Sequence, residues 1–154
     1  MMKRIVAIRV RGTPKVKKDI ADTLTMLMLT KPHHAVIIDD RPTYGGMLIK
    51  AKDYITYGEI DLLTLELLLK KWARKEGDHP ITEDYVKEKT GKTLKEFAER
   101  FLNFEEELDG LDIKRVFRLH PPRKGYKNVK RGYTQGGSVG YRGSAINTLL
   151  RRMI

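Results

Sequence analysis

The sequence contains no cysteine, and its last 42 residues contain no aspartate or glutamate. The missing cysteines exclude disulfide bonds and cysteine-ligated zinc. Long apolar runs are also missing: Leu62–Leu69 is interrupted by Thr64 and Glu66, and a membrane-spanning helix needs about 20 apolar residues. The first residues lead directly into a strand-like pattern, without the apolar run of a secretory signal. We therefore expect a cytosolic, globular protein.

The positive charge of the chain is concentrated towards its C-terminus. The formal net charge is +11, and residues 113–154 alone carry eleven Lys and Arg side chains. Residues 1–74 carry 14 basic and 8 acidic residues, whereas residues 75–112 carry 6 basic and 12 acidic residues. The three segments thus have formal charges of +6, −6 and +11. If a nucleic acid is the partner, the first and last segments should contact it and the acidic middle should face away.

Residues 1–60 have the pattern of a β-α-β-α-β unit. Stretches rich in Ile, Val and aromatic residues predict strands at 3–11, 34–39 and 54–60. Thr13-Pro14 is typical of a helix start, and the apolar residues that follow recur at three- and four-residue spacing to about Leu29. A second, short helix is predicted over residues 43–52, although Gly45-Gly46 disfavours it by about 1 kcal/mol per glycine.

Residues 61–112 are predicted to be helical. Asp61 can cap a helix that runs to about Lys75, and its leucines fall on more than one face, which predicts burial between two layers. A short helix is expected over Thr82–Lys89, with Gly91 as its stop, and Thr93-Leu-Lys-Glu96 is a capping box that begins another. Residues 76–110 therefore resemble a small acidic insertion.

The last 42 residues are predicted to extend from the folded body. Ile113–Leu119 is expected to be a fourth strand or an extended segment, and Ile146–Met153 a final helical turn. The segment between them has little apolar area and its like charges repel, so we expect it to become ordered only on a partner. The chain thus divides into a core (1–60), a helix with a helical insertion (61–112) and a strand with a basic tail (113–154).

No arrangement of residues indicates an active site. The neighbours Asp39-Asp40 and His33-His34 point to opposite faces of an extended chain, so neither pair can converge on one atom or metal ion. The glycines at 136, 137, 140 and 143 lack the Gly-Lys-Ser/Thr ending of a phosphate-binding loop. We expect a protein that is not an enzyme and that has no cofactor, no metal, no small-molecule substrate and no membrane partner.

The basic segments favour nucleic-acid binding. Lys and Arg neutralise phosphates, and tyrosines among them can stack on unpaired bases. A tail that serves only solubility is the alternative. A reader of duplex DNA is disfavoured because the basic residues mostly do not lie on one recognition helix. The candidate RNA-binding residues are Arg9, Arg11, Lys15, Lys17, Lys18, Arg41, Lys50, Lys52, Arg123, Lys124, Tyr126, Lys127, Lys130, Arg131, Tyr133, Arg142, Arg151 and Arg152.

Several stretches resemble the large-subunit ribosomal protein L-thirty family, which includes the eukaryotic protein called L-seven. They are Val10-Arg-Gly-Thr-Pro-Lys-Val-Lys-Lys, Pro42-Thr-Tyr-Gly-Gly-Met-Leu-Ile-Lys-Ala and, most specifically, the C-terminal Gly136-Gly…Ile146-Asn…Leu150-Arg-Arg-Met. The short bacterial members would correspond only to about residues 3–58. The long basic N-terminal extension of the eukaryotic members is missing, which indicates an archaeal-type protein.

The resemblance implies both a fold and a function. The implied fold is α+β: a loosely ferredoxin-like β-α-β-α-β core with a small three-stranded antiparallel sheet and an added helical insertion. The implied function is that of a structural constituent of the large ribosomal subunit, bound to 23S ribosomal RNA in the cytoplasm, with other ribosomal proteins as possible neighbours. A free-standing RNA-binding regulator is the alternative. The family contributes no catalytic residue and no cofactor.

Overall fold

The computed structural model describes residues 3–12, 15–75 and 77–154. In this part of the chain, five strands form one sheet in the order β4-β2-β1-β3-β5. The strands are β1 (Arg4–Arg9), β2 (His34–Asp39), β3 (Ile55–Glu59), β4 (Val116–Arg118) and β5 (Gly140–Tyr141). The helices are α1 (Lys18–Met26), α2 (Pro42–Lys50), α3 (Leu62–Trp72), α4 (Glu83–Thr90), α5 (Leu94–Leu102) and α6 (Ile146–Met153).

Strand β1 is the centre of the sheet and is antiparallel to both neighbours, β2 and β3. The β-α-β-α-β order predicted for residues 1–60 is confirmed, including helix α2 with its two glycines. The three-stranded antiparallel sheet implied by the family resemblance is present as β2-β1-β3, but two further strands extend it. Strand β4 adds to it where a strand or an extended segment was expected, and β5, which was not predicted, pairs with β3 in parallel.

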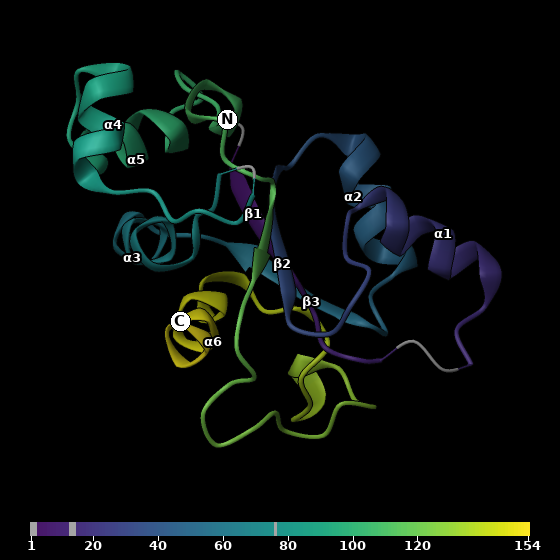
Figure 1. Cartoon of the computed structure of the whole chain (residues 1–154). Coiled ribbons are helices and arrows are strands. Elements are labelled where there is room, and N and C mark those ends of the chain that lie inside the picture. The colour runs from purple at the N-terminus through teal and green to yellow at the C-terminus, as the bar shows by residue number, and fades with distance from the viewer. Residues whose placement is uncertain (1–2, 13–14, 76) are drawn as a thin grey trace.

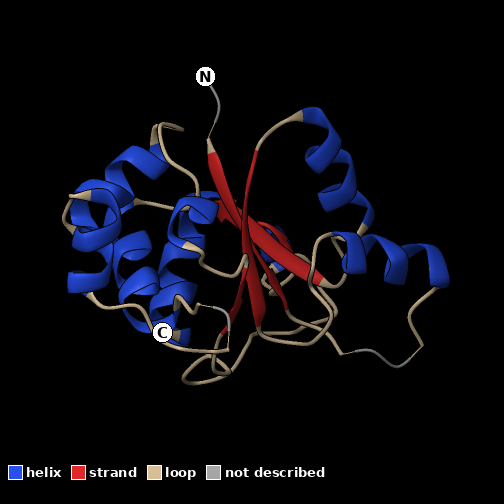
Figure 2. Cartoon of the chain, turned by 45° about the horizontal axis from the view of Figure 1, so that its top comes forward, coloured by secondary structure: helices blue, strands red, loops and turns tan. Residues whose placement is uncertain are grey.

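Helices cover both faces of the sheet (Figures 1 and 2). Successive side chains of a strand point to opposite faces. Ile5 and Ala7 therefore pack against α1 and α2, whereas Val6 and Ile8 belong to a second core built with α3, α5 and α6. All six residues of β1 are buried, as expected for a strand with helices on both sides.

The predicted helix boundaries have physical caps. Asp61 accepts a hydrogen bond from the backbone of Thr64 at 2.7 Å, and Thr82 and Thr93 cap α4 and α5 in the same way. Gly91 ends α4 with φ +72°, a conformation that favours glycine. The expected start of the first helix at Thr13-Pro14 lies outside the described residues, and α1 begins at Lys18.

The prediction that α3 lies between two layers is wrong for part of its surface. Leu65, Leu68 and Leu69 are fully buried, but Leu63 is 57% exposed and Leu67 is 39% exposed. The two exposed leucines are four residues apart and therefore lie on one side of the helix. The number of leucines in α3 therefore suggested more buried faces than the helix has.

The helical turn predicted over Ile146–Met153 is confirmed as α6, but the expectation that the tail extends from the folded body is wrong there. Helix α6 packs into the core through Ile146, Leu149, Leu150 and Met153, each at most 2% exposed. Burying such a side chain contributes about 1.5–3 kcal/mol, so α6 does not need a partner in order to fold. Averaging composition over 42 residues concealed that the apolar side of this helix is buried in the core.

The three segments of the chain share one core. Val6 of the first segment, Leu65 and Phe97 of the second, and Phe117 and Ile146 of the third all belong to the same cluster of buried side chains. The division at residues 60 and 112 stays a prediction.

Candidate nucleic-acid interface

A loop of residues 123–139, here called the basic loop, lies at the bottom of Figure 1. Five of its cations are solvent-exposed, and in the described part of the chain none of them pairs with a carboxylate. They are Arg123, Lys124, Lys127, Lys130 and Arg131. Because these charges have no internal partner, they are free to neutralise an external anion.

The basic loop is held to the body by polar contacts. The guanidinium of Arg152, on α6, donates through Nε and Nη2 to the carbonyl of Arg123 at 2.9 and 2.7 Å, and through Nη2 to the carbonyl of Gly125. Ser138 is buried and donates from Oγ to the carbonyl of Lys127 at 2.7 Å. Gly137 is required nearby, because a Cβ atom there would lie 1.9 Å from the carbonyl oxygen of Arg131. The loop therefore has a defined path.

The N-terminal candidates form a second basic area around α1. Lys15, Lys17 and Lys18 are exposed, and no other described residue forms an ion pair with them. Arg11 is half-buried, with its guanidinium carbon 4.9 Å from the centre of the Tyr54 ring. In Figure 1, helix α1 and the basic loop both lie away from α4 and α5.

The candidates between Arg41 and Lys52 differ in whether their side chains already interact with a carboxylate of the protein. The Arg41 guanidinium donates to both carboxylate oxygens of the buried Asp39, at 2.8 and 2.5 Å, and Arg41 itself stays exposed. This hydrogen bonding lowers the pKa of Asp39. Lys50 lies 4.0 Å from the exposed carboxylate of Asp19, a contact of little energy. Lys52 is exposed and has no carboxylate partner among the described residues.

Three other candidates are tied to the protein itself. Arg9 is 4% exposed, and its guanidinium donates to the carbonyls of Arg11, Leu29 and Gly12. Arg142 is half-buried and donates to Thr56 and to the carbonyl of Ser138. Arg151 lies 3.3 Å from Asp61. Arg9 therefore holds the loops around it and is removed from solvent.

The two candidate tyrosines differ in exposure. Tyr126 stacks on His33, with ring centres 5.7 Å apart and planes 13° apart, and its hydroxyl lies 2.9 Å from Nδ1 of that histidine. Burial raises the pKa of Tyr126. Tyr133 is 40% exposed, and one face of its ring lies 4.8 Å from the Arg142 guanidinium. Of these two rings, Tyr133 is the one open to a stacking base.

Three cations of the acidic insertion lie close to carboxylates of the protein itself. Lys92 pairs with Glu106 at 2.7 Å, Lys89 with Asp112 at 3.3 Å, and Arg100 lies 3.8 Å from Glu105. Helices α4 and α5 lie at the upper left of Figure 1, on the other side of the molecule from the basic loop. This placement agrees with the expectation drawn from the charge profile.

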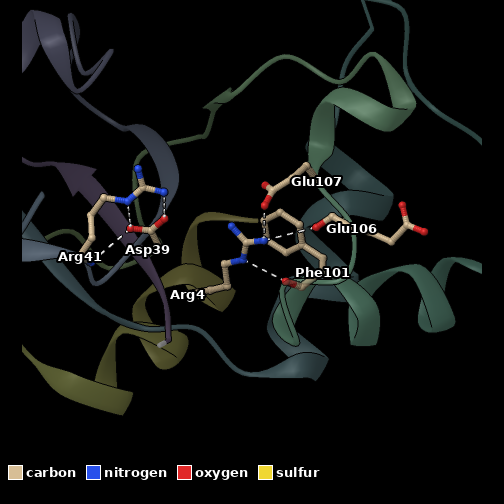
Figure 3. Close-up of polar contacts among 6 residues, drawn as sticks. All are labelled: Arg4, Asp39, Arg41, Phe101, Glu106 and Glu107. Carbon is tan, nitrogen blue, oxygen red and sulfur yellow. Dashed lines mark hydrogen bonds and ion pairs between the residues drawn. The ribbon is translucent and has the colours of Figure 1, made fainter. Parts of the chain in front are cut away.

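Arg4 is a buried residue that the sequence reasoning missed. It is 6% exposed and extends from β1 into the acidic insertion (Figure 3). Its guanidinium donates to the carbonyls of Phe101 at 2.9 Å and Glu106 at 3.3 Å and to the carboxylate of Glu107 at 3.0 Å. The rings of Phe101 and Phe104 lie 3.9 and 4.0 Å from it. An isolated arginine in an apolar strand carries no sequence signal that distinguishes this role.

Neither a metal cluster nor a membrane span is found in the described residues. No three His, Asp or Glu side chains within residues 3–12, 15–75 and 77–154 come together as metal ligands. None of the helices in these ranges has the length and apolar character needed to cross a bilayer. The described residues form a small α/β protein that carries exposed cations without carboxylate partners, as is common for proteins that bind a polyanion.

Comparison with known proteins shows the family to which this chain belongs. Residues 5–55 match the family model described as Ribosomal protein L30p/L7e. Proteins named large ribosomal subunit protein uL30 align over nearly the whole chain. The one from Methanobrevibacter smithii is 49% identical over 150 residues, covering 97% of this chain and 99% of its own. That from Methanopyrus kandleri is 51% identical over 148 residues, covering 94% and 99%.

A third relative, from Archaeoglobus fulgidus, is 50% identical over 148 residues and covers 95% of this chain. The chain belongs to the uL30 family of ribosomal proteins, in its archaeal form. Proteins of this family are structural, and the chain is not an enzyme. The family resemblance drawn from the sequence is therefore confirmed.

Proposed function

We propose that this protein is a structural constituent of the large ribosomal subunit, and that it binds 23S ribosomal RNA in the cytoplasm. The first part of the proposal is supported by relatives with the name of large ribosomal subunit protein and about 50% identity over nearly the full chain. The RNA-binding part depends chiefly on one observation: the cations of the basic loop are exposed and unpaired, whereas several in the acidic insertion are paired.

The proposed interface consists of two areas. The first is the basic loop, with Arg123, Lys124, Lys127, Lys130, Arg131 and the exposed ring of Tyr133. The second lies around α1 and α2, with Arg11, Lys15, Lys17, Lys18, Arg41, Lys50 and Lys52. Phosphate contacts from a rigid surface fix the orientation of an RNA without reading its bases, so the shape of the RNA should determine where the protein binds. In the second area, Arg9 holds the backbone at Arg11, Gly12 and Leu29 from inside.

Sedimentation separates this proposal from its alternative, a free-standing RNA-binding regulator. A tagged chain expressed in an archaeal host is followed through a sucrose gradient after a moderate salt wash. We expect it in the large-subunit fraction at about one copy per subunit, and other ribosomal proteins are then possible neighbours. If the washed chain stays in the soluble fractions while known large-subunit proteins remain bound to the particles, the alternative is correct.

A further inference from the structure

A small cavity lies between the basic loop and α6, and we call it the tail pocket. Its volume is about 230 Å³, and its walls include Tyr126, Lys127, Tyr133, Arg142, Thr148 and Arg152. This is below the roughly 300–1,000 Å³ of pockets that enclose a whole small molecule, so the tail pocket suits one group of a larger ligand.

The tail pocket is lined by positive charges. Lys127, Arg142 and Arg152 line it, and none of the described residues contributes a carboxylate to it. The two guanidinium groups donate only to neutral oxygens, those of Thr56 and Ser138 for Arg142, and of Arg123 and Gly125 for Arg152. Burial lowers the pKa of Arg142; Tyr133 and Tyr126 act in the opposite direction, and the positive charge of Arg152 adds a smaller lowering. Bringing like charges together in a partly enclosed space costs free energy that an anion would recover.

The surroundings indicate which anion. Tyr133 stands at the pocket with about 40% of its surface exposed, and Arg142 covers only one face of the ring. A nucleotide offers both a phosphate for the guanidinium groups and a base or sugar for the ring. The carboxylate of a protein partner offers only the first. The exposed cations of the basic loop also extend the charge beyond the pocket, as a phosphate backbone requires.

We propose that the tail pocket is a specific site for one backbone phosphate of the RNA, with the adjoining nucleoside stacked on Tyr133. The inference rests on the proposed function and adds a defined nucleotide site to a surface that would otherwise be only electrostatic. The folded tail builds this site: α6 supplies Thr148 and Arg152, and the buried turn at Ser138 holds Lys127 and Arg142 in place.

Two matched pairs of substitutions test the site through binding of the full-length protein to large-subunit ribosomal RNA. Thr148→Glu places a carboxylate at the pocket, and Gln135→Glu adds the same charge to an exposed position outside it. Lys127→Gln removes a pocket cation, and Lys95→Gln removes an exposed cation of the acidic insertion, outside both the pocket and the proposed interface. We expect each pocket variant to bind about tenfold or more weakly, and each control to lose less than about fivefold.

Titration of the full chain with inorganic phosphate, against sodium chloride at equal ionic strength, provides a readout that needs no RNA. The arginine side-chain N–H signals of Arg142 and Arg152 in NMR spectra should shift saturably with phosphate only, and Thr148→Glu should abolish the shift. Equal losses within each pair, or equal responses to both salts, would overturn the pocket and leave the proposed function standing. An unmodified chain that does not bind the RNA overturns the proposed function. Competition by a poly-glutamate peptide without a phosphate response would assign the pocket to a protein partner instead.

Discussion

Replacing Arg4 with methionine is expected to loosen the attachment of the acidic insertion to the sheet. Methionine keeps the apolar stem but removes the guanidinium, which connects β1 to Phe101, Glu106 and Glu107 (Figure 3). Hydrogen bonds from a charged donor contribute about 1.5–3 kcal/mol each, and the bond to Phe101 at 2.9 Å is buried. Contact of a cation with an aromatic ring adds about 0.5–1 kcal/mol.

The carboxylate of Glu107 adds little, because its side chain is 62% exposed and exposed pairs contribute less than about 1 kcal/mol. Together these contacts predict a loss of about 3 kcal/mol in the free energy of unfolding for Arg4→Met. For a chain of this length, that corresponds to a fall of about 6–12 °C in Tm. Glu107→Gln, the control, should lose less than about 1 kcal/mol.

Guanidinium denaturation measures both variants, with the single tryptophan, Trp72 at the end of α3, as a fluorescence probe. Hydrogen exchange adds location: in Arg4→Met the amides of α4 and α5 should lose more protection than those of β1. The reasoning is refuted if Arg4→Met lies within 1 kcal/mol of the unmodified chain, or if Glu107→Gln costs as much.

Three further predictions concern Asp39, the glycines and α6. Hydrogen bonding from Arg41 lowers the folded-state pKa of Asp39, so the contribution of this carboxylate to stability is present above about pH 4 and is lost as the pH falls through that folded pKa. The stability lost in Asp39→Asn should therefore shrink between pH 6 and pH 3 in urea titrations. A constant loss would contradict this. Gly137→Ala should lose about 1–3 kcal/mol of stability, because the new Cβ meets the Arg131 carbonyl. Gly45→Ala in α2, where nothing lies within 4 Å of the new Cβ, should gain about 0.5–1 kcal/mol. Changes of the same sign in thermal unfolding would contradict the geometry. Leu150→Ala, at a fully buried position, should cost about 2–5 kcal/mol in the same assay, against less than 0.5 kcal/mol for Thr148→Ala on the exposed side of α6; equal costs would mean that α6 is not part of the core.

Local signals in the sequence predicted the elements, and long-range contacts determined the site. Asp61 and Thr93 could be recognised as caps because a cap bonds the backbone within three residues. Arg9 donates to the carbonyl of Leu29, twenty residues away, and Arg142 donates to the hydroxyl of Thr56. Contacts between residues so far apart in the sequence cannot be predicted from residue spacing or composition. Basic residues that support the fold therefore could not be distinguished from those that remain exposed on the surface.

The folded tail also changes which experiment is informative. A chain that ends at Pro122 would lose Ile146, Leu149, Leu150 and Met153 from the core together with the tail cations. Its RNA binding would then report on folding as much as on charge. Substitutions of exposed side chains avoid this, because the body keeps its core and only the surface charge changes.

The most direct test of RNA binding by the basic loop is therefore a salt series with large-subunit ribosomal RNA and two variants of equal charge. One carries Arg123→Gln, Lys124→Gln and Lys130→Gln, and the other carries Lys87→Gln, Lys89→Gln and Lys95→Gln in the acidic insertion. Each lost phosphate contact should reduce the slope of log affinity against log salt by about 0.7–0.9, so the loop variant should be shallower by about 2–3. The insertion variant should keep nearly the slope of the unmodified chain. Equal slopes for all three proteins would contradict the proposed interface.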